Sequence, residues 1–151
     1  MIMIRIGENK IIKILVVDDD QNMINLIKFY LIKENVEIVP CTDGHAALSI
    51  LEKSRFDLIL IDILMPRMDG HTLLKKIVNE MKIDIPVIVV TAHGPTDNLM
   101  ELISDGAYDI LQKPFTINRL KLTLFNTLQH KNLRDRFIQL QKFIQNGKAS
   151  Q

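Results

Sequence analysis

The 151 residues include a single cysteine, Cys41, so no disulfide bond can form within one chain. Cys41 ends an apolar run, and we interpret it as a buried, chemically inert thiol. The four histidines lack the close spacing that zinc motifs require: His45, His71, His93 and His130. The sequence therefore excludes a disulfide scaffold and gives no sign of a zinc module.

Long hydrophobic runs and an excess of one charge are also missing. No apolar stretch reaches the ~18–20 residues needed to cross a bilayer, and the opening residues 1–6 are too short for a signal peptide. The sequence has 19 Lys and Arg against 18 Asp and Glu, a net charge of +1. We therefore expect a cytoplasmic protein with neither a membrane nor nucleic acid as a direct partner.

Two patterns alternate regularly along this chain, whose length fits one domain. Aliphatic runs predict buried strands over residues 11–17, 36–41, 57–61, 86–90 and 107–112. Apolar residues at helical spacing predict helices over 23–35, 46–51, 73–81 and 99–103, and from about 116. This order predicts an α/β fold, a doubly wound five-stranded parallel sheet (order 2-1-3-4-5, flavodoxin-like) with helices on both faces and an extended C-terminal helix.

Polar side chains follow four of the five predicted strands: Asp18 and Asp19 the first, Asp62 the third, Thr91 the fourth and Lys113 the fifth. Because the carboxyl ends of parallel strands share one edge, we expect these groups to meet there. Two carboxylates ~4 Å apart repel by ~4 kcal/mol at an effective dielectric near 20, which a bound cation would relieve. Oxygen ligands favour the hard ions Mg²⁺ or Mn²⁺.

Asp62 is the candidate nucleophile, because a carboxylate can accept a phosphoryl group to form an acyl phosphate. A metal ion and Lys113 would stabilise the transferring group, and Thr91 would offer its hydroxyl to a phosphoryl oxygen. Taken singly, each residue has a simpler interpretation, as a helix cap (residues 18–20), a turn residue, a strand-end hydroxyl or a surface lysine. Their combination at one edge favours the functional interpretation.

Three neighbouring features have a structural interpretation. Asp20 is expected to cap the first helix, and Asp69-Gly70 predicts a turn that enters the third helix. The Lys113-Pro114 bond is a candidate cis peptide, since cis costs only ~0.5–1 kcal/mol before proline.

From residue 11 to about residue 130 the sequence resembles the receiver domain of bacterial two-component response regulators. The motifs that carry the resemblance are Leu15-Val16-Val17-Asp18-Asp19, Asp62-Ile63-Leu64-Met65-Pro66-Arg67-Met68-Asp69-Gly70, Thr91-Ala92, Gly106-Ala107 and Lys113-Pro114-Phe115. The resemblance implies a signalling switch that is phosphorylated on Asp62 by a histidine kinase or phosphotransfer protein with Mg²⁺. Such a chain is not an enzyme beyond its own phosphorylation and slow self-dephosphorylation.

The resemblance also implies roles for single residues. Asp18, Asp19, Asp62 and the backbone carbonyl of Leu64 would bind the metal, while Thr91 and Lys113 would contact the phosphoryl group. Phosphorylation would remodel the 4-5-5 face, formed by the fourth helix, fifth strand and fifth helix, to control a partner or output domain.

The sequence departs from the family at the position where a Tyr or Phe usually swings towards the phosphorylation site. This position is Ile110, and Tyr108 lies on the same strand face but a rung farther from Thr91. We therefore expect a smaller or differently routed switch. Leu64 and His93 occupy the positions that tune the lifetime of the acyl phosphate. Because Leu64 has no polar group to orient water, we expect slow self-dephosphorylation.

The chain continues beyond what one closing helix requires. A first set of apolar residues should face the core, and a second set recurs at steps of four, three and four, as in a coiled-coil seam. The two sets do not share a helical phase, so we expect a shift near His130. The first set is Leu120, Leu124 and Leu128; the second is Leu133, Phe137, Leu140 and Ile144.

We divide the chain into a lead segment (1–9), which is either an added strand or disordered, a receiver domain (10–130) and a helical extension or linker (131–151). The extension is either a solvated basic helix or frayed tail, or a helix that pairs with a second copy or leads into an output domain. A homodimer could form through the 4-5-5 face or through this helix.

Two other functions remain open. A metal-dependent aspartyl phosphatase of the haloacid-dehalogenase type also uses a strand-end Asp, Mg²⁺ and Lys, but it needs a second Asp two residues on, where this sequence has Leu64. A degenerate receiver would serve only as a docking module. A flavodoxin-like carrier would need a phosphate loop where this chain has three carboxylates, and no P-loop or dinucleotide fingerprint occurs.

Overall fold

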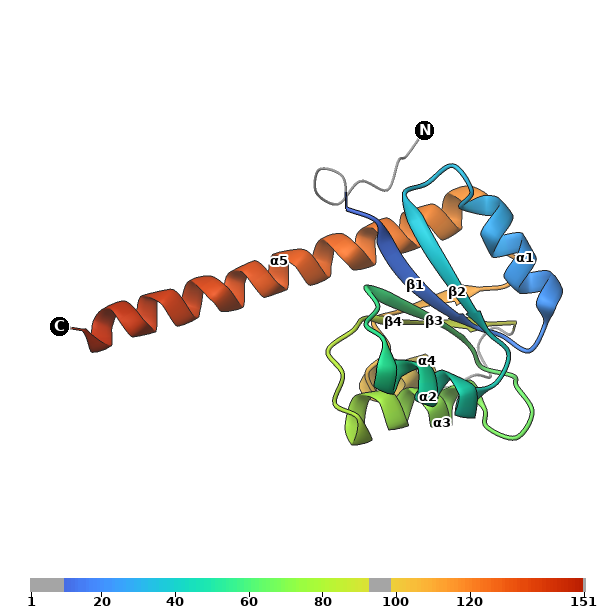
Figure 1. Cartoon of the computed structure of the whole chain (residues 1–151), viewed down its shortest axis with the longest axis horizontal. Helices are drawn as coiled ribbons and strands as arrows, with labels where there is room; N and C mark the ends of the chain where they lie inside the picture. The colour runs from blue at the N-terminus through green and yellow to red at the C-terminus, as the bar shows by residue number, and fades with distance from the viewer. Residues whose placement is uncertain (1–9, 93–98, 151) are drawn as a thin grey trace.

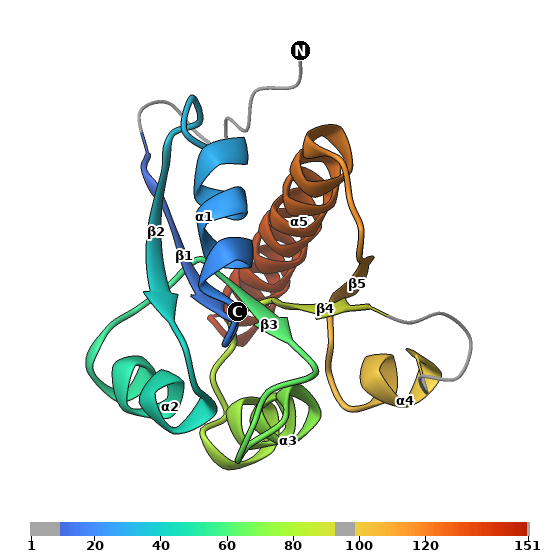
Figure 2. The same ribbon diagram turned by 90° about the vertical axis from the view of Figure 1, so that its right-hand side faces the viewer.

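Five strands form one parallel sheet in the computed structural model, which describes residues 10–92 and 99–150 (Figure 1; Figure 2). In chain order they are β1 (Ile12–Val17), β2 (Val36–Cys41), β3 (Leu58–Asp62), β4 (Val87–Thr91) and β5 (Asp109–Gln112). Their order in space is β2-β1-β3-β4-β5, and every neighbouring pair is parallel. The predicted fold class and strand order are confirmed.

Helices cover both faces of the sheet (Figure 2). One face carries α1 (Gln21–Tyr30) and α5 (Ile117–Ala149); the other carries α2 (Gly44–Lys53), α3 (Gly70–Lys75) with a short π-helical continuation, η1 (Lys76–Glu80), and α4 (Leu99–Ser104). Alternate strand residues serve the two layers because successive side chains point to opposite faces. In β1, Ile14 and Val16 pack towards α1 and α5, whereas Leu15 and Val17 pack towards α2 and α3.

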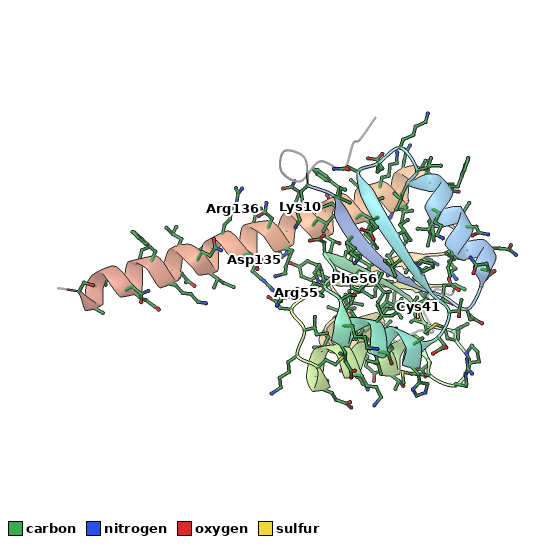
Figure 3. All side chains as sticks on the ribbon, viewed as in Figure 1. Lys10, Cys41, Arg55, Phe56, Asp135 and Arg136 are labelled. Atoms are coloured by element: carbon green, nitrogen blue, oxygen red, sulfur yellow. The ribbon has the colours of Figure 1, made fainter. Side chains whose placement is uncertain are left out.

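The side chains of both layers are closely packed between sheet and helices (Figure 3). Cys41 is buried, as predicted, in the core layer between the sheet and α2, together with Phe56. Such burial on both faces explains why the central strands are continuous aliphatic runs and not alternating ones.

The first helix is shorter than predicted. It ends at Tyr30, five residues before Asn35, although the apolar spacing continues and Leu31 is buried. Leu31 leaves the helical conformation (φ −105°, ψ 7°), and its carbonyl accepts the Glu34 backbone N–H at 2.9 Å as the chain turns towards β2. Leu31 is thus buried although it lies after the end of the helix, so apolar spacing alone overestimates the length of α1.

The predicted fifth strand begins two residues late, at Asp109. Ala107 instead belongs to the turn that follows α4, where its N–H donates to the Leu102 carbonyl at 2.9 Å. Gly106 makes this closure with a φ of +111°, a conformation that favours glycine. Of the three apolar residues that predicted α4, only Leu102 is buried; Leu99 and Ile103 are 36% and 44% exposed.

The last helix is one unbroken element of 33 residues that projects from the domain (Figure 1). Leu120, Leu124 and Leu128 are buried, as predicted, whereas the second apolar set is 49–62% exposed. At ~100° per residue, the two sets lie on opposite sides of this continuous helix. The expected shift near His130 is thus a change of apolar face without a break in the helix.

Ion pairs fix the base of the projecting helix to the loop before β4. The Lys131 Nζ atom lies 3.0 Å from Asp84 Oδ2, and Arg134 pairs with the other oxygen of the same carboxylate.

None of the helices within residues 10–92 and 99–150 has the length and apolarity to cross a bilayer.

Candidate functional site

Three carboxylates meet at the carboxyl edge of the sheet, as the sequence predicts. Asp62 is the last residue of β3, and Asp18 and Asp19 directly follow β1. One carboxylate oxygen from each lies within 4.8 Å of the others. Asp18 and Asp62 are only 2% and 7% exposed, whereas Asp19 faces solvent. The cluster is therefore two buried carboxylates with a third at its mouth.

Backbone hydrogen bonds orient the first of these carboxylates. The Asp18 N–H donates to the Cys41 carbonyl at 3.0 Å, which extends the pairing of β1 with β2. The Asp20 N–H donates to Asp18 Oδ1 at 2.9 Å, and the Asp20 side chain accepts the Asn22 N–H, so Asp20 caps α1 as predicted. Asp18 thus keeps its other oxygen, Oδ2, directed towards the cluster.

Lys113 supplies the cation of the site. Its Nζ atom lies 3.2 Å from Asp62 Oδ1 and 3.4 Å from Asp18 Oδ2, and its side chain is 19% exposed. The Lys113 backbone N–H donates to the Thr91 carbonyl at 2.7 Å. The Lys113-Pro114 peptide bond is cis, as predicted. One ammonium therefore bridges the two buried carboxylates.

The negative charge in this cluster is only partly compensated. Burial raises the pKa of Asp18. The pKa of Asp62 is raised mainly by burial and secondly by the neighbouring negative charge of Asp18. Lys113 lowers both pKa values by its charge and hydrogen bonds, but the net direction is upward. Two buried carboxylates that resist ionisation beside one ammonium form a site that a further cation would stabilise.

Thr91 ends β4 at the same edge and is 3% exposed. It borders a hollow of about 380 Å³ that is also lined by Leu99, Ile110, Gln112 and Arg119. Ile110 is thus the residue that stands beside this hollow where the family resemblance leads one to expect an aromatic ring.

Tyr108, the aromatic residue directly before β5, is held against α5. Its hydroxyl lies 2.6 Å from His130 Nδ1, and the two rings meet edge to face with centroids 5.4 Å apart. Leu64 is 62% exposed and contributes no polar side-chain atom, while His93 lies outside the described residues.

Gly70 has a function in the site that the sequence analysis missed. Asp69 caps α3, as a turn into a helix requires, but the Gly70 N–H also donates to the Ile63 carbonyl at 2.8 Å. A Cβ atom on Gly70 would lie 2.2 Å from the Asp62 carbonyl oxygen. Only a glycine allows the loop after β3 to close against the backbone of Asp62, and its place directly after Asp69 gave no hint of this.

Comparison with known proteins gives a consistent result. A family model described as "Response regulator receiver domain" matches residues 14–125. The heme response regulator HssR of Staphylococcus aureus (strain bovine RF122 / ET3-1) is 35% identical over 122 residues, which are 81% of this chain and 54% of that protein. The two-component response regulator ORR26 of Oryza sativa subsp. japonica is 37% identical over 121 residues, 79% of this chain and 20% of that protein. The chain thus spans about half of HssR and a fifth of ORR26.

Solved structures share the fold. The signal receiver domain of a putative Luxo repressor protein from Vibrio parahaemolyticus superimposes with a TM-score of 0.77 at 34% identity, covering 83% of this chain and 95% of that one. NtrX from Brucella abortus in complex with ADP gives a TM-score of 0.78 at 31% identity, covering 85% of this chain and 29% of that one.

Proposed function

Because the chain belongs to the response regulator receiver domain family, we propose that it is a phospho-acceptor switch whose acceptor is Asp62. The observation that carries the proposal is the meeting of Asp18, Asp62 and Lys113 at the ends of three strands, with the lysine 3.2–3.4 Å from both carboxylates. A histidine kinase or a phosphotransfer protein of a two-component system would be the donor.

The oxygen donors of the site fit magnesium. Three carboxylates within 4.8 Å of one another, two of them with raised pKa values, are a hard-ligand set with an unmet need for positive charge. Asp18, Asp19, Asp62 and the carbonyl of Leu64 would hold Mg²⁺, or Mn²⁺ in its place. When bound, the ion supplies positive charge that offsets the negative charge of the phosphoryl oxygens.

The chain's own side chains would carry out the transfer. One Asp62 carboxylate oxygen attacks the phosphorus of a phosphohistidine; the O–P bond forms as the P–N bond breaks, and the freed imidazole nitrogen takes a proton from solvent. The Lys113 ammonium and the Thr91 hydroxyl donate hydrogen bonds to the phosphoryl oxygens as their charge develops. The hydroxyl of Thr91 and the switch face would then adjust to the new anion.

The decisive experiment is incubation of the full chain with Mg²⁺ and acetyl phosphate, followed by intact-mass measurement. We expect the added mass of one phosphoryl group in the wild type and none in Asp62→Asn. Asp57→Asn, at the opposite end of β3, is the matched control and should keep the added mass. Phosphorylation that persists in Asp62→Asn would refute the assignment.

The same experiment separates the alternative functions. A degenerate docking module would gain no mass in either protein. An aspartyl phosphatase would hydrolyse the donor catalytically, which requires a second carboxyl group two residues after the nucleophile. That position is Leu64, so we propose a switch and not an enzyme that turns over external substrate.

We further propose that the acyl phosphate is long-lived. Hydrolysis needs a water oxygen to attack the phosphorus of phospho-Asp62, and Leu64 has no polar atom with which to orient that water. Introducing Leu64→Asn should accelerate the loss of the phosphoryl mass. A half-life of only seconds for the Mg²⁺-bound wild type would overturn this proposal.

The projecting half of α5 is the proposed link to a partner. Its exposed apolar stripe at coiled-coil spacing would contact a second copy of the chain or lead into an output domain, and the 4-5-5 face is the alternative dimer surface. Truncation after residue 130, compared with the full chain by light scattering with and without phosphorylation, tests this. An unchanged oligomeric state would remove the helix as a dimer contact. The division into residues 1–9, 10–130 and 131–151 stays a prediction.

A further inference from the structure

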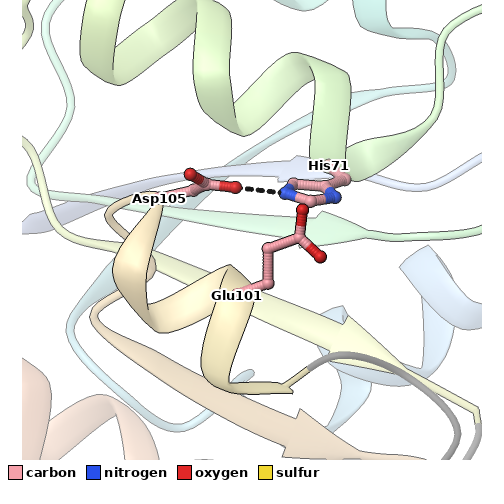
Figure 4. A group of neighbouring side chains, drawn as sticks. All are labelled: His71, Glu101 and Asp105. Carbon is pink, nitrogen blue, oxygen red and sulfur yellow. Dashed lines mark hydrogen bonds and ion pairs between the residues drawn. The ribbon is translucent and has the colours of Figure 1, made fainter.

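We propose that His71, Glu101 and Asp105 form a second cation site, specific for Zn²⁺ or a similar first-row transition ion, that joins α3 to α4. One ligand atom from each of the three side chains lies within 4.8 Å of the others (Figure 4). His71 comes from the first turn of α3, whereas Glu101 lies on α4 and Asp105 directly follows that helix, its N–H donating to the Glu101 carbonyl at 2.8 Å. This site is separate from the acidic cluster at the sheet edge and does not depend on phosphorylation.

The distances suit a tetrahedral ion. His71 Nε2 and Asp105 Oδ2 are 2.6 Å apart and joined by a hydrogen bond. In a tetrahedral zinc site with bonds of about 2.0–2.1 Å, two ligand atoms stand roughly 3.3 Å apart. A side-chain movement of less than ~1 Å would therefore open the hydrogen bond enough for an ion to replace its proton. Glu101 would be the third ligand, and water the fourth.

Local contacts fix the start of α3 beside His71 and the end of α4 beside Asp105. Asp69 caps α3 two residues before His71, its carboxylate accepting the Thr72 N–H at 2.7 Å. Asp105 is followed by Gly106, where a Cβ would stand 2.9 Å from the Val78 side chain of η1. The chain thus passes so closely over η1 that the end of α4 is fixed beside α3. Preorganised ligands on rigid elements favour metal binding.

The chemistry of the ligands selects the ion. A site of one imidazole and two carboxylates favours zinc and neighbouring transition metals. Mg²⁺, in contrast, prefers sites in which every ligand is oxygen. The His71 and Asp105 side chains are about a quarter exposed, so an ion can enter from solvent. Lys75, one turn after His71, places its Nζ atom 3.6 Å from Asp105 Oδ2 and would oppose the incoming cation.

Calorimetric titration of the full chain with Zn²⁺ tests the site, with excess Mg²⁺ present to occupy the sheet-edge carboxylates. We expect one Zn²⁺ per chain and a shift of the His71 ring resonances in NMR spectra. His71→Gln, Glu101→Gln and Asp105→Asn should each weaken binding at least tenfold. His45→Gln, an exposed histidine on α2, is the matched control and should bind as the wild type does.

Lys75→Gln gives a test in the opposite direction. Removal of a positive charge beside the ligand should tighten Zn²⁺ binding severalfold. Because the Lys75 side chain is about half exposed, this substitution should not disturb folding. Binding of equal strength in His71→Gln and the wild type, or no tightening in Lys75→Gln, would overturn the proposal. Circular dichroism confirms that each variant is folded.

Discussion

Gly70→Ala is the sharpest test of how the loop after β3 supports the site. The added methyl group would lie 2.2 Å from the Asp62 carbonyl oxygen, 2.8 Å from Ile63 Cα and 2.9 Å from Asp62 C, all of them backbone atoms. Ordinary contact begins at 3.4 Å, so the two backbones would have to separate by more than ~1 Å. The 2.8 Å hydrogen bond from the Gly70 N–H to the Ile63 carbonyl would then be lost.

The magnitude follows from these contacts. Overpacking costs ~1–3 kcal/mol and the lost hydrogen bond ~1 kcal/mol, while Ala regains up to ~1 kcal/mol in helix propensity. We expect a net loss of about 1–3 kcal/mol in the free energy of unfolding, measured by urea denaturation without Mg²⁺. If Asp62 is the acceptor, a displacement of this size should also slow its phosphorylation about 100-fold.

Gly147→Ala is the matched control, because no atom lies within 4 Å of a Cβ at that position. It should not lower the unfolding free energy of the domain and could only raise it, by up to ~1 kcal/mol in helix propensity. A Gly70→Ala protein as stable as this control would show that the close approach to the Asp62 backbone is not a structural requirement.

Three further predictions concern buried or bordering side chains. Mg²⁺ binding should weaken, as pH falls, at values clearly above the ordinary carboxyl pKa of 3.8, since the cation needs ionised Asp18 and Asp62 and both pKa values are raised; calorimetry at stepped pH measures this, and weakening only below 3.8 would contradict it. Lys121→Met should cost about 3–5 kcal/mol in urea denaturation, because it removes the ammonium that lies 2.6 Å from the buried Glu34 carboxylate. Addition of Glu34→Leu should recover most of that loss, and no recovery would speak against the buried charge as the cause. Ile110→Phe should change the unfolding free energy by less than ~1.5 kcal/mol, because the bordering hollow of about 380 Å³ accepts the ring; a larger loss would show that the hollow cannot take it.

Strand positions and the sheet-edge site could be predicted from the sequence because both follow from one rule of parallel sheets. Buried strands must be aliphatic on both faces, and their carboxyl ends are level, as the pairing of Asp62 with Val90 and of Thr91 with Gln112 illustrates. The polar residue that ends each strand is therefore brought to the same edge. Local pattern and topology together were sufficient here.

Other features depend on contacts between segments far apart in the chain. The end of α1 could not be predicted, because Leu31 keeps the apolar spacing after the helix has stopped. The role of Gly70 arises from an approach to Asp62 that no spacing encodes. Likewise, His71 and Asp105 are 34 residues apart and meet only because two helices pack side by side.

The continuous last helix makes the projecting segment a lever arm. Residues 131–149 extend ~28 Å beyond the base of the helix at 1.5 Å per residue, and a 10° tilt of its docked half would swing the tip by ~5 Å. The pivot lies near Lys131 and Arg134, which both form ion pairs with Asp84. Leu120 lies ~17 Å on the other side of this pivot, so repacking that shifts the helix there by ~3 Å would displace the tip by the same ~5 Å, far enough for a neighbouring molecule to sense.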